Sequence, residues 1–283
     1  MTQHAEIRHK ESMPRMLVIG GSDSSAGAGI QADLKTGMAF RVEVSTVLTA
    51  ITAQNSLGVQ KISAVPAAMV TAQIDSVCSD LVPRVIKTGM LVNAACVCVV
   101  GQALQRHEIP FVVCDPVLAS TSGRTLLNRS GREALLALFP RFTLVTPNAH
   151  EAAILCQRTV ESDAEYLDAG RALRDLGASA VLLKGGHREG KEAADLLLLA
   201  DQPEPLRFAA PRVITRNDHG TGCVLASAIA AQLALGVSLV EAVAQARTFV
   251  QRALCSSATC ALGKGRGGMI LFPPELPEQP AQG

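Results

Sequence analysis

Short apolar runs of strand length alternate with longer segments of helical pattern along most of this 283-residue chain. Each run ends at glycine or at polar residues, which is typical of a buried strand that leaves a sheet through a loop. The alternation predicts an α/β fold in which a central, mostly parallel sheet is covered by helices on both faces. Strands are expected at residues 16–19, 42–52, 85–88, 111–114, 143–145 and 180–183, with a hairpin at 196–199 and 206–209.

Several expected helix starts have the spacing of a capping box, in which a serine and a glutamate three residues later satisfy each other's backbone N–H groups. The pairs are Ser130 with Glu133, Ser162 with Glu165, and Ser238 with Glu241. The covering helices are expected at residues 30–40, 66–80, 94–106, 224–235 and 239–257, and also after Ser130, Asn148 and Ser162.

Polar groups follow several of the expected strands at the point where each strand ends. They are Gly20, Gln54, Asp115, Asn148 and Lys184. Because open α/β sheets bind ligands at the carboxyl ends of their strands, we expect these residues at one edge of the sheet. The Gln54 amide can pair with a ring nitrogen and an amino group, or it can simply satisfy a turn. Lys184 can meet a phosphate as a point charge.

Asn148 and Glu151 are three residues apart at an expected helix start, so their side chains share one face of the helix. An amide and a carboxylate on one face can hold a hydrated magnesium ion. The alternative is ordinary surface polarity.

The segment 217–223 precedes a run, 224–235, that only Ser227 and Gln232 interrupt with polar groups. A helix there is apolar all round and therefore buried. The glycines at its start predict an anion site made of free backbone N–H groups, into which Cys223 would point with a pKa lowered by the helix dipole. The alternative is a glycine-capped core helix with Cys223 as a small buried hydrophobe.

The composition narrows the possible partners. Lys and Arg number 26 against 25 Asp and Glu, and aromatic residues make up only 3%, so we expect neither nucleic acid nor a membrane as a partner. Eight cysteines without a C-x-x-C pair indicate reduced, mostly buried thiols in a cytoplasmic protein. We expect a single domain at 16–272 between flexible tails at 1–15 and 273–283, with no signal region.

Residues 27–32 match a dinucleotide fingerprint of the G-x-G-x-x-A type, which would indicate an oxidoreductase. The loop 20–27 is too long for the tight turn that this motif needs, and no acidic residue ends the second strand. The fingerprint is therefore the weaker interpretation.

Taken in order, the motifs closely resemble those of the hydroxymethylpyrimidine/phosphomethylpyrimidine kinases, over about residues 16–268. They are Gly20-Gly21-Ser22-Asp23, Ala26 to Lys35, Ala53-Gln54-Asn55, Lys87 to Leu91, Asp115-Pro116-Val117, Thr146-Pro147-Asn148 with Glu151, Lys184 to His187, and His219 to Cys223. The resemblance implies the ribokinase-like three-layer α/β/α fold. It also implies transfer of the ATP γ-phosphoryl group to hydroxymethylpyrimidine and then to its monophosphate, for thiamine biosynthesis.

The same resemblance implies a role for each matching residue. Gly220, Thr221, Gly222 and Cys223 would be catalytic, with Thr221 also contacting the nucleotide together with Lys184 and Asn148. Gln54, Asp33, Met90, Val117 and Gly21 would bind the pyrimidine. Asn148, Glu151 and Asp115 would hold Mg²⁺, mostly through water, with a monovalent cation such as K⁺ left open. A homodimer is implied as well.

Among the departures from the family pattern, Val224 and His150 are expected to affect nucleotide binding. A pyridoxal or pyridoxine kinase remains the nearest alternative, because that ring also carries a hydroxymethyl group. A non-catalytic vitamin-binding regulator is disfavoured by the presence of Cys223, Lys184 and Glu151.

Overall fold

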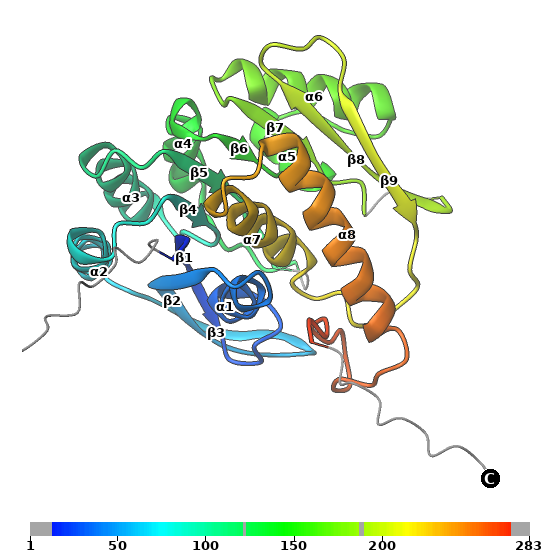
Figure 1. Ribbon diagram of the computed structural model, residues 1–283, viewed down its shortest axis with the longest axis horizontal. Helices are drawn as coiled ribbons and strands as arrows, with labels where there is room; N and C mark the ends of the chain where they lie inside the picture. The colour runs from blue at the N-terminus through cyan, green and yellow to red at the C-terminus, as the bar shows by residue number, and fades with distance from the viewer. Residues whose placement is uncertain (1–12, 121–122, 187–189, 273–283) are drawn as a thin grey trace, which may run out of the picture.

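The computed structural model describes residues 13–120, 123–186 and 190–272, which form a nine-stranded sheet of order β3-β2-β1-β4-β5-β6-β7-β8-β9 (Figure 1). Neighbouring strands from β2 to β7 are parallel, and β3, β8 and β9 are antiparallel to their neighbours. The predicted, mostly parallel sheet is confirmed. The strands are β1 Arg15–Asp23, β2 Glu43–Asn55, β3 Gly58–Ala64, β4 Val85–Thr88, β5 Phe111–Cys114, β6 Leu144–Val145, β7 Ala180–Leu183, β8 Glu192–Leu199 and β9 Leu206–Pro211.

The sequence pattern missed β3 and confirmed the hairpin β8–β9. β3 is an edge strand that pairs only with β2, and most of its residues are partly or fully exposed. It therefore lacks the continuous apolar run by which the other strands were identified. β1 and β2 also extend beyond their predicted ends, to Asp23 and Asn55. The added residues include Asp23 and Gln54, which line the cleft described below, so the apolar run stops before the strand does.

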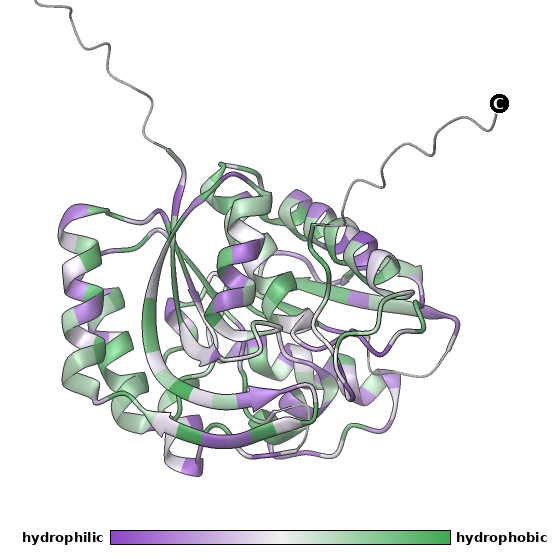
Figure 2. Ribbon diagram, turned by 90° about the horizontal axis from the view of Figure 1, so that it is seen from below, coloured by the Kyte–Doolittle hydropathy of each residue, from purple (hydrophilic) through white to green (hydrophobic). Residues whose placement is uncertain are grey.

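Helices cover both faces of the sheet, as predicted. α1, α7 and α8 pack on one face and share a core with it, whereas α2 to α6 pack on the other. In Figure 2 helices at the surface carry both hydrophilic and hydrophobic residues, as covering helices do, whereas α7 is almost wholly apolar. Their bounds are α1 Gly29–Ala39, α2 Ala67–Asp80, α3 Ala94–Arg106, α4 Arg129–Leu136, α5 Ala149–Cys156, α6 Asp163–Asp175, α7 Thr221–Ala234 and α8 Leu239–Ser257, with a 3₁₀ turn at Phe139–Arg141.

The predicted capping pairs have different outcomes. Ser162 and Glu165 form the full capping box at α6, and Ser238 caps α8 by accepting from the backbone N–H of Glu241. The prediction for Ser130 is wrong, because α4 starts earlier and its cap is Asn128. Asparagine is at least as good an N-cap as serine, so the earlier start is favoured.

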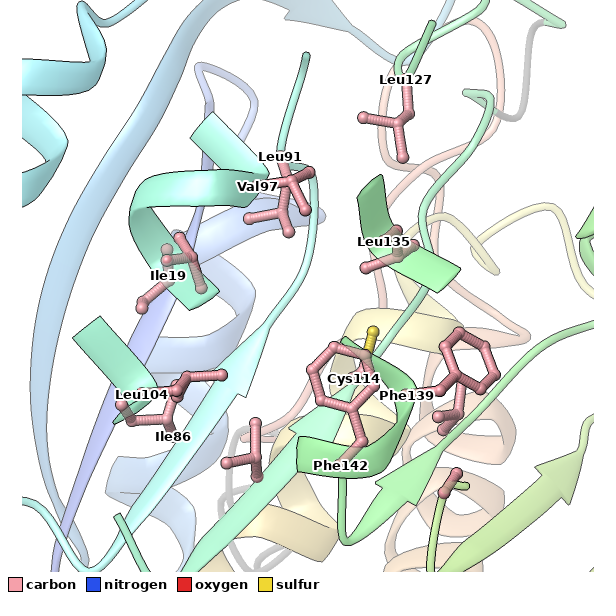
Figure 3. Close-up of a cluster of buried hydrophobic side chains, with 14 of the residues drawn as sticks. Ile19, Ile86, Leu91, Val97, Leu104, Cys114, Leu127, Leu135, Phe139 and Phe142 are labelled. Atoms are coloured by element: carbon pink, nitrogen blue, oxygen red, sulfur yellow. The ribbon is translucent and has the colours of Figure 1, made fainter. Parts of the chain in front are cut away.

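One hydrophobic core lies on each face of the sheet, and α7 is enclosed in the core that it shares with α1 and α8. All residues of α7 from Val224 to Ala234 are buried, which confirms the prediction of an enclosed helix. Figure 3 shows the opposite core, where Leu104 of α3 lies beside Ile86 of β4, and Cys114 of β5 lies beside Phe142. Because α7 contacts β1, β4 and β5, its first turn lies at the carboxyl edge of the central strands.

The cysteine prediction is wrong in part. The cysteines are free, but only Cys78, Cys96 and Cys114 are buried, whereas Cys98, Cys255 and Cys260 are exposed. An apolar neighbourhood in sequence does not say which face of a helix a side chain occupies.

The expected flexible tails at 1–15 and 273–283 lie outside the described residues, except for residues 13–15. Arg15 is already the first residue of β1. Within the described ranges, none of the helices has both the length and the apolar character needed to span a bilayer.

Candidate active site

A cleft of about 730 Å³ runs along the carboxyl edge of the parallel strands. All the strand-end residues predicted to meet at one edge contribute to its lining, which confirms that prediction. The other residues predicted for the site also line it, and they come from loops, from α1 and from the first turn of α7. The predicted residues in the lining are Gly20, Gly21, Asp33, Gln54, Met90, Asp115, Val117, Asn148, Glu151, Lys184, Gly220, Thr221, Gly222 and Cys223.

The first turn of α7 is open toward the cleft. Its N-cap, Gly220, has a φ of 82°, and a Cβ there would lie 2.0 Å from the carbonyl oxygen of Gly27, so only glycine fits. Thr221 turns its N–H back to Asp218. Within the described ranges, no acceptor takes the N–H of Gly222 or Cys223. Residues 220–223, called the anion loop below, therefore leave the amide protons of Gly222 and Cys223 available to an anion, as predicted.

The Cys223 thiol contradicts one expectation. Burial raises its pKa to about 12, although the positive charge of Lys87 and the backbone N–H of Gly29 oppose the shift. The prediction of a lowered pKa is wrong, because loss of hydration outweighs the helix terminus. The thiol is therefore protonated near neutral pH.

A lysine and two carboxylates converge beside the anion loop. Lys184 Nζ lies 2.8 Å from Asp115 Oδ1 and 3.5 Å from Glu151 Oε2. Burial favours the neutral form of Asp115, but the charges of Lys184 and Lys87 bring the pKa of Asp115 below its usual value. At Glu151 burial prevails and the pKa is raised. A Cβ on Gly222 would lie 3.1 Å from Lys184 Nζ, so this cation stands at the anion loop.

Asn148 and Glu151 form a reciprocal capping box at the start of α5. Asn148 Oδ1 accepts from the N–H of Glu151 at 2.9 Å, and Glu151 Oε2 accepts from the N–H of Asn148 at 2.8 Å. Glu151 is buried, so the alternative of surface polarity is wrong for it. The spacing of the pair was itself the signal for a capping box.

Asp33 lies fully buried under the cleft. Its carboxylate accepts from Lys87 Nζ at 2.9 and 3.0 Å and from Ser227 Oγ of α7 at 2.6 Å. Burial raises the pKa of Asp33, although the charge of Lys87 opposes this. The sequence reasoning gave Lys87 no role. Its signal was a charged residue within the otherwise apolar start of β4.

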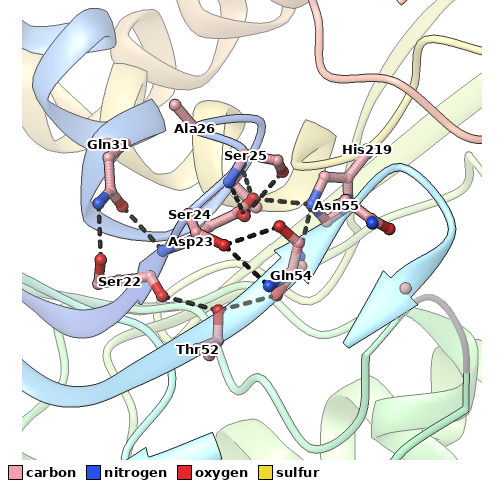
Figure 4. A network of polar contacts seen from close by, with 12 residues as sticks. Ser22, Asp23, Ser24, Ser25, Ala26, Gln31, Thr52, Gln54, Asn55 and His219 are labelled. Atoms are coloured by element: carbon pink, nitrogen blue, oxygen red, sulfur yellow. Dashed lines mark hydrogen bonds and ion pairs between the residues drawn. The ribbon is translucent and has the colours of Figure 1, made fainter. Parts of the chain in front are cut away.

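A polar network joins the β1–α1 loop to the anion loop (Figure 4). Asp23 accepts from Ser25 and from the N–H of Ala28, and its Oδ2 lies 3.0 Å from His219 Nε2. Burial alone would raise the pKa of Asp23, but the hydrogen bonds from His219, Ser25 and Ala28 lower it to about 2. The sequence reasoning assigned no role to Asp23 or His219, although both lie in its motifs.

The two departures fall in different places. Val224 is buried in the core around α7, and it is not among the residues that line the cleft. A polar residue at that position would face the core here. His150, by contrast, lines the cleft and is exposed.

The side chains of the cleft that could bind a metal ion suit contacts through water better than direct coordination. Across the described ranges, no group of three or more His, Cys, Asp and Glu side chains is arranged to hold a metal ion. Asp115 and Glu151 are already engaged by Lys184 and by the capping box. Magnesium retains several waters and is commonly bound by one or two carboxylates and phosphate groups, so these residues fit contacts through water.

Comparison with known proteins agrees with this geometry. Residues 23–269 match the family described as phosphomethylpyrimidine kinase. A hydroxymethylpyrimidine/phosphomethylpyrimidine kinase of Rhizobium meliloti (strain 1021) is 46% identical over 90% of this chain and 96% of that protein. The thiamine biosynthesis bifunctional protein ThiED of Geobacter sulfurreducens is 43% identical over 89% of this chain and 51% of that protein.

Among solved structures, the pyridoxal kinase of Staphylococcus aureus in complex with pyridoxal has the same architecture. It superposes with a TM-score of 0.83 at 30% identity, over 92% of this chain and 93% of that one. The three-layer arrangement predicted from the resemblance is thereby confirmed.

Proposed function

We infer the function of this chain from one premise, which is that the chain belongs to the phosphomethylpyrimidine kinase family. The chain transfers the γ-phosphoryl group of ATP to hydroxymethylpyrimidine and then to the resulting monophosphate, which yields the pyrophosphate used in thiamine biosynthesis. It is a phosphotransferase.

One observation supports this reaction most strongly. Among the described residues, no acceptor takes the amide protons of Gly222 and Cys223, and Gln54 and Lys184 line the same cleft. Phosphoryl transfer proceeds through a loose transition state, in which positioning and charge neutralisation matter more than a strong base. The anion loop neutralises charge on the migrating group, while Lys184 and Asn148 contact the nucleotide phosphates.

Magnesium enters with ATP as part of the substrate and would supply positive charge to its phosphates. Asp115, Glu151 and Asn148 hold its waters. Lys184 lies close to both carboxylates and offsets part of their negative charge, which suits a cation screened by water and phosphate.

Gln54 binds the pyrimidine edge, and Met90 and Val117 pack against the ring and its methyl group. Gly21 leaves room for this, because a Cβ there would lie 3.0 Å from Met90 Sδ. Asp33 stands below the pocket and acts there through Lys87 and Ser227.

The protonated Cys223 thiol suits the second transfer. A neutral thiol does not repel a phosphomonoester, whose oxygen is already ionised and needs no base, whereas an aspartate in its place would repel it. In the first transfer only the thiolate form can take the hydroxyl proton. The first transfer is therefore expected to accelerate more steeply with rising pH than the second.

One assay tests the function. ATP consumption is measured with magnesium and with hydroxymethylpyrimidine, its monophosphate or pyridoxal offered separately. We expect turnover with both pyrimidines. Turnover with neither pyrimidine would contradict the proposal.

Pyridoxal kinase is the second candidate, favoured by the superposition on the Staphylococcus aureus enzyme. Faster turnover of pyridoxal than of hydroxymethylpyrimidine in the same assay would establish it instead.

The glycines that suggested an oxidoreductase have another explanation in the structure. A Cβ on Gly27 would lie 2.8 Å from His219 Cδ2, and one on Gly29 would lie 2.4 Å from the carbonyl oxygen of Gly21. These glycines allow the β1–α1 loop to pack against neighbouring segments of the protein, which accounts for them without a dinucleotide.

The finer assignments complete the proposal. The kinase is one domain at 16–272 that works in the cytoplasm as a homodimer, with magnesium required and a monovalent cation such as K⁺ as a further activator. Gel filtration and omission of each cation from the assay test these points.

A further inference from the structure

His219 joins three parts of the cleft that are far apart in sequence (Figure 4). Its Nε2 lies 3.0 Å from Asp23 Oδ2 and 2.9 Å from the amide of Gln54. Its backbone N–H donates to the carbonyl oxygen of Gly267, and Gly220 of the anion loop follows it directly. The imidazole side chain is only 13% exposed.

The proton on Nε2 is fixed by its first partner. Asp23 holds a low pKa, so its carboxylate is ionised and can only accept. His219 Nε2 therefore carries a proton and donates it to Asp23. A ring nitrogen that bears a proton has no lone pair to accept from Gln54.

The hydrogen-bond donors and acceptors around the Gln54 amide also determine which way that amide is turned. Thr52 Oγ1 gives its single proton to the carbonyl oxygen of Ser22 at 2.9 Å, which leaves its lone pairs for the amide end 3.3 Å away. All partners are satisfied when Gln54 turns its Nε2 to Thr52 and its Oε1 to His219. The backbone of Gln54 cannot shift to offer another solution, because Ser24 Oγ bonds both its N–H and its carbonyl oxygen.

We propose that His219 is a positioning residue that shares its Nε2–H between Asp23 and Gln54, holds the Gln54 oxygen toward the anion loop, and thereby sets which way the pyrimidine ring lies. This inference rests on the proposed function.

The chemistry of the substrate makes this orientation matter. The amino group of the pyrimidine is on the carbon next to the one that bears the hydroxymethyl group, and the ring nitrogen lies on its other side. Gln54 Oε1 accepts from the amino group, and Gln54 Nε2 donates to the ring nitrogen. With Oε1 toward His219, the amino group and the neighbouring hydroxymethyl group both turn toward the anion loop. A reversed amide would direct the hydroxyl away from the site of transfer.

The test compares hydroxymethylpyrimidine with an analogue that lacks the amino group. Wild type should prefer the aminopyrimidine in kcat/KM by roughly a hundredfold, because the analogue has no amino group to donate to Gln54 Oε1. In His219→Leu this preference should fall about tenfold. KM should rise because productive binding of the aminopyrimidine is weaker, and kcat should fall because part of the bound substrate is misoriented. A merely structural role would lower turnover of both compounds equally and leave the preference unchanged, which would overturn the proposal.

Three further variants sharpen the result. His219→Gln can donate to both Asp23 and Gln54, so it should restore most of the preference. Gln54→Ala should abolish it, and adding His219→Leu to Gln54→Ala should lower it no further. His107→Phe removes a similar histidine–aspartate pair, His107 with Asp75 at 2.8 Å, and should leave the preference unchanged.

Thr52→Val provides a test should His219→Leu fail to fold. It removes the acceptor for Gln54 Nε2, together with the hydrogen bond that Thr52 donates to the carbonyl oxygen of Ser22, and should lower the preference about threefold. An unchanged preference in Thr52→Val would overturn the orientation, and so would an unchanged preference in a folded His219→Leu. Failure of the proposed function is a separate result, because wild type would then phosphorylate neither compound.

Discussion

The helices α5 and α7 both begin at the same cleft, but their first turns are capped in opposite ways. The start of α5 is closed by its own side chains, because Asn148 and Glu151 form a capping box. The start of α7 has no side-chain cap, and its N-cap is Gly220 in a left-handed conformation. A cap consumes the amide protons that an anion would use, so a helix start can be closed for stability or left open for a ligand.

The open start of α7 is tolerated because the helix is held elsewhere. Its residues from Val224 to Ala234 are buried between the sheet, α1 and α8. A missing cap costs about 1 kcal/mol, whereas each fully buried leucine or isoleucine side chain contributes about 1.5–3 kcal/mol. By contrast α5 has only eight residues and depends more on its cap.

The largest effect should follow from closing α7. Gly220→Ala places a methyl group against the carbonyl oxygen of Gly27 and disfavours the φ of 82°. Both transfers should fall roughly a thousandfold, because the anion loop moves. The control is Gly236→Ala at the other end of α7, which has a φ of 86° but no close contact, and which should lose stability and keep its turnover. Equal losses in the two variants would mean that strain alone explains the effect.

The second-largest effect should come from removing the thiol of Cys223, at the open start of α7. Cys223→Ala should slow the first transfer roughly a hundredfold and the second by less than about threefold, since only the first needs a proton acceptor. The steep rise of the first transfer with pH should disappear as well, as measured by steady-state turnover between pH 6 and 9. Cys98→Ala, at an exposed position on α3, is the control. Wild-type rates for both transfers in Cys223→Ala would leave the thiol without a role.

A third helix start, that of α1, extends the comparison, because the last residue of β1 holds the backbone of its N-cap residue, Ala28. Asp23 accepts from the N–H of Ala28, and its folded pKa of about 2 lies below the unfolded value of 3.8. The carboxylate therefore stabilises the fold above pH 3.8, and this contribution is lost as pH falls through about 2. Asp23→Asn should lower the free energy of unfolding by about 2 kcal/mol at pH 6 and by less at pH 3, as measured by urea unfolding. A difference that does not change with pH would contradict this account.

The smallest effect should come from opening α5. Asn148→Ala removes the cap and should lower the free energy of unfolding by about 1 kcal/mol. Asn128→Ala removes the equivalent cap from α4, away from the cleft, and should cost a similar amount. Only Asn148→Ala should also raise the magnesium concentration needed for half-maximal turnover. The same magnesium requirement in both variants would limit Asn148 to a capping role.

Much of the site was predictable because its signals are local. The ends of the strands near Gln54 and Asp115 are recognised in the sequence by the change from apolar to polar residues. The apolar run after Cys223 likewise indicates a buried helix. The capping box of Asn148 and Glu151 was equally local, because its spacing is visible in the sequence, but the pair was predicted only as a magnesium site. The edge strand β3 left no comparable signal, since an exposed strand has no apolar run.

The amino-acid sequence by itself determined the order of strands and helices, the enclosed position of α7 and the glycines that keep its start open, because periodicity and backbone freedom depend on near neighbours in the chain. Tertiary structure alone decided that Lys87 neutralises Asp33, that His219 meets Gln54 and Asp23, and that the Cys223 thiol keeps its proton. Charges and pKa values depend on burial and on partners brought from distant parts of the chain, and no short stretch of sequence contains that information.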